Sequence, residues 1–294
     1  AQTGQQLTLW PEFVESYGLL LEQALDQNSD KALMARALSL PNITFIGQQL
    51  DVVDPAEIYQ VLDLVCATLA SEYEDKFKAV YDANRTATIF DKSFDAQAQR
   101  ALQNTALRFI TKHPSNPAYD TAKSQYDHAN NMTDRVAALS CLADSVTPER
   151  EDVFADFYDR FKSYQLVVDK WFSLQAAAIR EQTVQDVIRL RGHDEFTIKN
   201  PNRVRSLYGA FAMNNPVCFH AASGQGYDIL ADAIIELNEI NPQIAARLLT
   251  PLREWKRYTL LHQEKMKAAL ERIAALPDIS PNVYEIVNKS LQDA

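Results

Sequence analysis

The segment NPNRVRSLYGAFAMNNPVCFHAASGQGY, residues 200–227, holds two Asn-Pro pairs and three of the chain's seven glycines. Asparagine directly before proline is typical of a helix start. The asparagine side chain accepts a free backbone N–H of the first turn, while proline at the first helical position has no N–H to satisfy. The segment therefore predicts helix starts at Pro201 and Pro216, with a helix stop and a new start around Gly224.

The same signal recurs along the whole chain, where a polar capping residue precedes eight of the twelve prolines. These pairs are Asp54-Pro55, Asn116-Pro117, Thr147-Pro148, Asn200-Pro201, Asn215-Pro216, Asn241-Pro242, Thr250-Pro251 and Ser280-Pro281. Between them, apolar residues recur at helical spacing, as at Ile58, Val61 and Val65. The Asn-Gly and Asp-Gly turns that signal hairpins between alternating apolar runs are missing.

The sequence therefore predicts an all-α fold. The expected helices cover residues 11–26, 30–39, 55–83, 95–112, 117–128, 133–144, 148–163, 165–178, 183–191, 201–212, 216–221, 227–239, 242–249, 251–275 and 281–291. Many short helices joined by short loops indicate an irregular superhelical array of antiparallel helix pairs, a HEAT- or armadillo-like α-solenoid. We expect a single helical domain over residues 1–294, with a weaker boundary near residues 113–118.

Composition narrows the classes of partner. The net charge of −10 and the pI of about 5.0 argue against nucleic acid, which requires a cationic surface. The stretch from Arg247 to Arg272 is different, with seven basic residues against three acidic ones. Such a stretch is usually a solvated helix face; the alternative is a lining that meets a carboxylate.

The three cysteines form no C-x-x-C pair, which predicts small core residues in a reducing compartment. No apolar run approaches the roughly 20 residues of a membrane span, and no signal-peptide pattern opens the sequence. We therefore expect a cytoplasmic protein without a membrane partner.

No residue pattern predicts catalysis by this chain alone. The closest two of the five histidines are 15 residues apart, whereas ligands on one helix need a spacing of three or four. We therefore expect surface or capping roles for the histidines and neither a metal site nor a cofactor in this chain. The G-x-S-x-G, P-loop and G-x-G-x-x-G motifs are also absent.

The opening segment carries a family resemblance, and further matches follow in the same order. They are Asn200–Phe211, Asn215-Pro216, Phe219-His220, Gly224–Tyr227, His128–Asp134, Asp169–Phe172, Asn241-Pro242, Ala246–Leu248, Lys256–Tyr258 and Gln263–Met266. Together they resemble the C-terminal helical domain of the bacterial aminopeptidase N family, the zinc-dependent alanyl aminopeptidases of the gluzincin type. The resemblance is strong over residues 120–290 and looser before them.

The resemblance implies a division of labour. In this family, zinc-activated water removes the N-terminal residue of a peptide in a thermolysin-like domain upstream, and the C-terminal helical domain covers that site and restricts entry to short peptides. The family's H-E-x-x-H helix does not occur in this sequence. The resemblance thus implies a domain without catalytic residues of its own, whose partners are the upstream catalytic domains and short peptides.

The resemblance also nominates residues of the substrate channel. A peptide held by its amino end must direct its carboxylate elsewhere, and arginine suits a carboxylate. The candidates are Arg205 and Arg247, followed by Asn202 and Arg203. Pairing with acids of neighbouring helices is the alternative role for each.

A function of a different class remains open. A stand-alone helical scaffold could bind a protein or peptide on its concave face. Such a scaffold should have a polar exterior, whereas a domain of a peptidase should expose an apolar patch where other domains dock.

Overall fold

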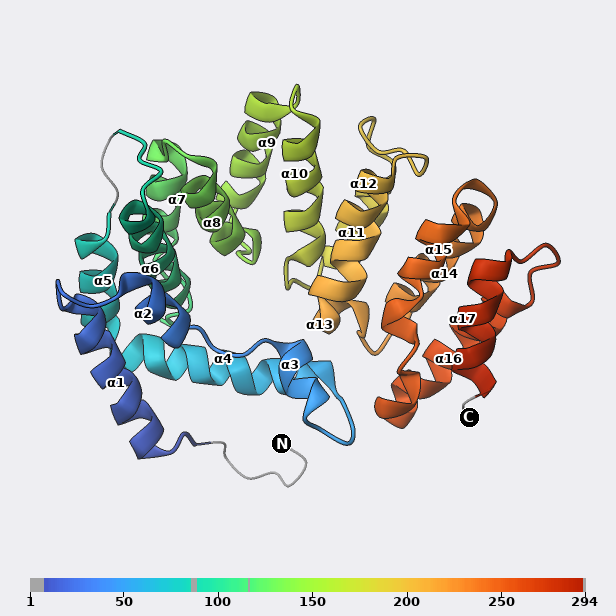
Figure 1. Ribbon diagram of the computed structural model, residues 1–294, viewed down its shortest axis with the longest axis horizontal. Coiled ribbons are helices and arrows are strands. Elements are labelled where there is room, and N and C mark those ends of the chain that lie inside the picture. Colours follow the sequence, from blue (N-terminus) through green and yellow to red (C-terminus); the bar gives the residue numbers. More distant parts are fainter. Residues whose placement is uncertain (1–7, 86–88, 116, 293–294) are drawn as a thin grey trace. The chain divides into compact units, whose positions relative to one another are not determined.

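The computed structural model describes residues 8–85, 89–115 and 117–292, and their regular structure is helical (Figure 1). Within these residues the one bridge of β type is an isolated parallel pairing of Val53 with Tyr258. The all-α prediction is confirmed.

The chain divides into two compact units. Unit 1 comprises the described residues of Ala1–Asn42 and Tyr59–Val153, and unit 2 comprises those of Ile43–Ile58 and Phe154–Ala294. Segment 113–118, where the sequence suggests a weaker boundary, falls within the range of unit 1.

Unit 1 is built from pairs of packed helices, α5 with α6 and α7 with α8. Its helices are α1 (Pro11–Leu25), α2 (Lys31–Ala37), most of α4 (Pro55–Glu72), α5 (Glu74–Ala83), α6 (Phe94–Ile110), α7 (Tyr119–His128), α8 (Met132–Ala143) and the start of α9 (Glu149–Phe161). Its core contains Tyr17, Phe77 and Phe109, and the last two rings stack with centroids 4.5 Å apart.

Unit 2 repeats the pairing, with α14 against α15 and α16 against α17. Its elements are α3 (Ile43–Gln48), the first turn of α4, the larger part of α9, α10 (Gln165–Ala177), α11 (Thr183–Arg191), α12 (Pro201–Val204), the π-helix η1 (Arg205–Asn214), α13 (Pro216–Phe219), α14 (Gln225–Ile240), α15 (Pro242–Leu248), the 3₁₀ turns η2 (Thr250–Leu252) and η3 (Trp255–Arg257), α16 (Leu260–Ala274) and α17 (Pro281–Gln292). Trp171, Trp255 and Tyr227 are buried in its core.

The proline caps are largely confirmed. Side chains of Asp54, Asn200, Asn215, Asn241 and Ser280 accept backbone N–H groups in the first turn of the helices that they precede. The remaining pairs behave differently: Pro148 directly precedes α9, Thr250-Pro251 begins only a 3₁₀ turn, and Asn116 lies outside the described residues.

Two predicted helices are interrupted, for identifiable reasons. Residues 55–83 break at Tyr73, whose hydroxyl donates to the carbonyl of Val14 at 2.8 Å. Residues 251–275 become α-helical only from Leu260, because the carbonyl of Arg257 accepts the N–H of Val53 at 2.7 Å and Tyr258 is extended. Hydrogen bonds between distant residues do not change the spacing of apolar residues, so the sequence pattern could not predict these two breaks.

The sequence did not predict α3, which Arg257 holds. The guanidinium donates to the carbonyls of Gly47 and Leu50 at 2.9 and 2.8 Å, near the C-terminal end of α3. The carbonyl of Gly47 also accepts the N–H of Leu50 at 3.3 Å, and a cation at the C-terminal end of a helix complements the helix dipole. Arg257 thereby fastens segment 43–58 to the rest of unit 2.

All three cysteines are free, as predicted; Cys218 is buried, whereas Cys66 and Cys141 are only partly buried. None of the helices in the described part of the chain is long and apolar enough to cross a membrane.

Gly224 and Gly226 shape the junction between α13 and α14. Gly224 has a left-handed φ of 78°, the conformation in which glycine carries no steric cost. A Cβ on Gly226 would lie 2.2 Å from the carbonyl oxygen of Phe219, so α14 begins directly against the end of α13.

We expect Gly226→Ala to destabilise the protein by about 1–3 kcal/mol, because the added methyl group collides with backbone that cannot move freely. Gly209→Ala is the matched control, since its nearest contact would be an ordinary 3.8 Å and alanine favours helix. Urea denaturation measures both. Equal denaturation midpoints for the two variants would contradict the close packing at Gly226.

Candidate functional site

Three of the four candidate channel residues, Asn202, Arg203 and Arg205, lie at the start of a continuous helical segment. The side chain of Asn200 accepts the N–H of Asn202 at 2.9 Å, and Pro201 occupies the first turn of α12. After one turn the backbone passes into η1, where the sequence predicts an ordinary α-helix. The buried residues of η1 include Leu207, Tyr208 and Phe211. Their spacing is compatible both with an α-helix, which has i→i+4 backbone hydrogen bonds, and with a π-helix, which has i→i+5 bonds, so it does not distinguish the two.

Arg203 is buried and fully engaged. Only 1% of it is exposed, and it pairs with the carboxylates of Asp169 and Glu195. Its Nε donates to the carbonyl of Glu195 at 2.9 Å, its Nη1 donates to the carbonyl of Gln165 at 3.1 Å, and it lies 5.5 Å from the ring centre of Phe172. This is the alternative role, pairing with acids of neighbouring elements, that the sequence left open.

Arg205 lies two residues further on and has a different environment. It is exposed, and its guanidinium donates to the side-chain oxygen of Asn202, which is also exposed. Neither side chain forms an ion pair with a carboxylate of the described residues. The structure therefore brings Asn202 and Arg205 together on the surface and separates them from Arg203.

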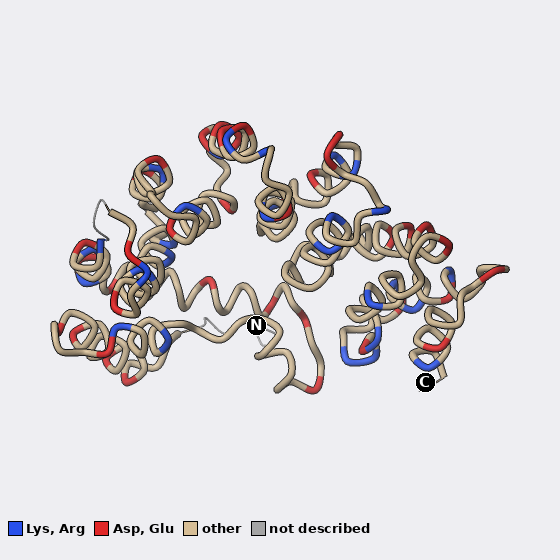
Figure 2. The backbone as a smooth tube through the Cα atoms, turned by 45° about the horizontal axis from the view of Figure 1, so that its top comes forward, with Lys and Arg blue, Asp and Glu red and all other residues tan. Residues whose placement is uncertain are grey.

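Arg247 lies elsewhere in unit 2, in the last turn of α15, and is also exposed. It belongs to the basic stretch that runs through α15, η2, η3 and α16 (Figure 2). Several members of that stretch have structural partners: Arg257 holds α3, Lys265 donates to the carbonyl of Ala222, and Arg272 pairs with Asp232. Within the described chain, the side chains of Arg247 and Arg253 form no hydrogen bond or ion pair.

Two of the histidines, which the sequence predicts on the surface or at helix ends, have buried side chains joined by hydrogen bonds; His220 does cap the C-terminal end of α13, but His262 lies within α16. Nδ1 of His220 lies 2.9 Å from the hydroxyl of Tyr227, and that hydroxyl lies 3.2 Å from Nδ1 of His262. His220 also stacks on Tyr258, with ring centroids 4.4 Å apart. Burial lowers the pKa of His220 to about 3, with a smaller contribution from His262, and burial lowers the pKa of His262 as well.

The side chains of His220, Tyr227 and His262 interact through hydrogen bonds between neutral groups. Because a hydroxyl carries one hydrogen, Tyr227 can donate to one imidazole and must accept from the other. The three side chains satisfy one another in the core, which is what a buried polar group requires.

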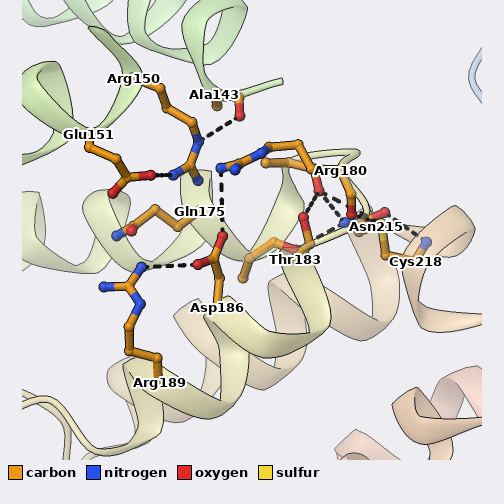
Figure 3. Close-up of polar contacts among 12 residues, drawn as sticks. Ala143, Arg150, Glu151, Gln175, Arg180, Thr183, Asp186, Arg189, Asn215 and Cys218 are labelled. Atoms are coloured by element: carbon orange, nitrogen blue, oxygen red, sulfur yellow. Dashed lines mark hydrogen bonds and ion pairs between the residues drawn. The ribbon is translucent and has the colours of Figure 1, made fainter. Parts of the chain in front are cut away.

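A second polar cluster fixes the end of η1. Asn215 donates to the carbonyl of Ala178 at 2.7 Å and accepts the N–H of Cys218 at 3.1 Å (Figure 3). The hydroxyl of Thr183 donates to the same carbonyl at 2.6 Å. The Asn-Pro pair at residue 215 therefore caps α13 and also anchors it to the segment between α10 and α11.

No group of three or more His, Cys, Asp or Glu side chains among residues 8–85, 89–115 and 117–292 is placed to hold a metal ion. The described side chains thus do not fit a zinc site.

Stacked pairs of helices joined by short connections define the class of protein, an α-solenoid of the armadillo type. A family model described as "Domain of unknown function (DUF3458_C) ARM repeats" matches residues 1–292. The chain belongs to this family.

Proteins of known activity are similar over almost the whole chain. Aminopeptidase N of Escherichia coli K12 is 39% identical over 99% of the chain, and aminopeptidase N of Haemophilus influenzae is 34% identical over 99%. In each case the chain spans 33% of the relative's length. These matches confirm the predicted resemblance to the C-terminal portion of bacterial aminopeptidase N.

A solved structure agrees with these relatives. The crystal structure of Legionella pneumophila aminopeptidase A in complex with aspartic acid superposes with a TM-score of 0.88 and 28% sequence identity, covering 100% of this chain and 35% of that one. The chain thus spans about a third of each of these proteins.

We expect Arg203→Ala to destabilise the protein by about 3–5 kcal/mol, because it removes a fully buried guanidinium and leaves the partly buried carboxylate of Asp169 without its partner. Arg205→Ala removes an exposed side chain and should change stability by less than about 0.5 kcal/mol. Chemical denaturation of the two variants provides the measurement, and similar losses would refute the division between a buried and a surface arginine.

The low pKa of His220 predicts acid sensitivity. Its folded-state pKa of about 3 lies below the ordinary value of 6.5, so the unfolded chain binds the proton first as the pH falls. The free energy of unfolding should therefore decrease between pH 6.5 and 3, by up to about 1.4 kcal/mol per pH unit from this group.

The measurement is urea denaturation across that pH range. His220→Gln keeps a polar group beside Tyr227 but does not titrate, so its pH dependence should be shallower than that of the unmodified chain. His128→Gln, at an exposed position, should leave the dependence unchanged. A slope unaffected by His220→Gln would show that this histidine does not contribute.

Proposed function

We propose that this chain is the C-terminal domain of a zinc aminopeptidase that removes N-terminal residues from short peptides in the cytoplasm. The domain has no catalytic residues. It covers the active site, forms a wall of the peptide cavity and limits access to it. The observation that carries this proposal is the similarity to aminopeptidase N over 99% of the chain.

In this proposal the zinc and the catalytic groups belong to the two thirds of the relatives' length that this chain does not span. The chain's partners are those catalytic domains and the peptide itself. Exposed apolar side chains support a covered surface in unit 1: Trp10 and Phe13, one turn apart at the start of α1, are 80% and 40% exposed. Apolar surface of this kind is typical of a site where another domain docks.

The channel residues of the proposal are Arg205, Asn202 and Arg247. Their exposure without carboxylate partners in the described residues leaves their donors available for the carboxylate of a bound peptide. Arg203 supports them structurally, because its donors are already used by Asp169, Glu195 and Gln165.

The test uses the complete aminopeptidase that contains this chain. Arg205→Ala or Arg247→Ala should raise KM for trialanine by about three- to tenfold, because a charge-assisted hydrogen bond to the carboxylate is lost. KM for the chromogenic amide of alanine, which has no such carboxylate, should not change. Arg36→Ala, an exposed arginine of unit 1, is the control.

Equal effects on both substrates would remove the carboxylate role from these arginines. The 294-residue chain by itself, supplied with zinc, should not hydrolyse the chromogenic amide. Turnover by the chain alone would overturn the assignment as a domain without catalytic residues.

A further inference from the structure

Unit 1 contains a cavity of about 360 Å³ beside α4. The residues that line it include Leu40, Cys66, Arg108, Lys112, Tyr119 and Asp144. Every residue of α4 from Leu62 to Thr68 remains half-exposed, although an apolar helix normally buries one face completely. The side of α4 that carries Cys66 borders this cavity.

Two cations line this space. Arg108 lies in the last turn of α6, and Lys112 lies in the turn that directly follows the helix. The guanidinium of Arg108 forms no hydrogen bond or ion pair with another described residue. Like charges that line one cavity repel each other, and an anion between them would relieve the repulsion.

The contacts of Lys112 leave its ammonium group with donor capacity. Its Nζ lies 3.4 Å from a carboxylate oxygen of Asp63 and 3.9 Å from one of Asp144. Close charge-assisted hydrogen bonds measure about 2.7–2.9 Å, so neither carboxylate holds the ammonium tightly. Lys112 can therefore donate to a ligand without losing a short ion pair.

The surrounding charge favours a ligand that carries both signs. Arg108 and Lys112 are balanced by the carboxylates of Asp63 and Asp144. Burial raises the pKa of Cys66 and of Cys141 to about 11, so neither thiol adds charge near neutral pH. A multiply charged anion would meet the carboxylate of Asp144 in this cavity and that of Asp63 close to Lys112, whereas a zwitterion finds partners for both ends.

We propose that this cavity binds a small zwitterion, a free amino acid or a dipeptide, with its carboxylate between Arg108 and Lys112 and its ammonium group toward Asp144. The hydroxyl of Tyr119 provides a further hydrogen-bonding group on the lining. This site goes beyond the proposed function, which assigns no ligand to unit 1 and does not depend on it.

The test is titration calorimetry of the 294-residue chain with L-alanyl-L-alanine. One site is expected, with a Kd of about 0.1–10 mM for a ligand of this size. Arg108→Ala should weaken binding about tenfold, because the carboxylate loses a charge-assisted partner. Arg253→Ala removes an equally exposed arginine of unit 2 and should leave Kd unchanged.

Modified dipeptides test the contribution of each charged end of the ligand separately. Alanyl-alaninamide lacks the carboxylate and N-acetyl-alanyl-alanine lacks the ammonium group, so each should bind about tenfold more weakly. Absence of dipeptide binding, or equal effects of Arg108→Ala and Arg253→Ala, would overturn the proposal. Inorganic phosphate binding more tightly than the dipeptide would overturn the zwitterion class.

The reactivity of the cysteines tests where the dipeptide binds. Cys66 and Cys141 line the cavity, whereas Cys218 is buried in unit 2. Alanyl-alanine should slow the reaction of the first two thiols with N-ethylmaleimide and leave that of Cys218 unchanged. Slowing of none, or of all three alike, would place the dipeptide outside this cavity.

Discussion

The burial of one cation organises the candidate channel region. A buried guanidinium is costly unless carboxylates and carbonyls replace its water, and Arg203 obtains these partners from α10 through Asp169 and from the preceding loop through Glu195. Because these partners come from separate elements, the start of η1 is fixed relative to both. The exposure of Arg205 follows from this arrangement, since residues two apart on an α-helix point about 200° apart.

Polar groups within the core specify the rest of this segment. Asn215 is fully buried, and its side chain joins the start of α13 to the backbone between α10 and α11. Tyr227 links His220 to His262 on α16. Apolar packing alone would tolerate small rotations of these helices, whereas each of these side chains is satisfied only in one orientation.

The cap signals predicted the starts of α4, α12, α13, α15 and α17 because a cap is a local interaction: Asp54, Asn200 and Asn241 need only their own next three residues. Interactions between distant residues could not be predicted in this way. Arg257 stabilises α3 from more than 200 positions away in the sequence, and no local sequence pattern predicts this interaction. The fold class was therefore predictable, while α3 and the late start of α16 were not.

The candidate site divides in the same manner. All four candidates were named from the sequence by resemblance, but their different environments were not predicted. A signal for Arg203 was available, since it precedes Leu207 by four residues and so shares the buried face, whereas Arg205 shares its face with Gly209. The partner of Arg203, Asp169, lies 34 residues earlier in the sequence. This pairing depends on the packing of α10 against η1.

The helix cap also connects local sequence to the proposed function. Asn200 accepts the N–H of Asn202, and the side chain of Asn202 in turn accepts a hydrogen bond from Arg205. The cap residue Asn200 thus orients Asn202, and Asn202 orients the guanidinium of Arg205. Buried Arg203 anchors the same helical turn to the core. A long side chain held in this way loses less conformational entropy when a carboxylate binds than a free surface arginine does. Within the proposed function, a domain without catalytic residues would therefore contribute preorganised positive charge to peptide binding.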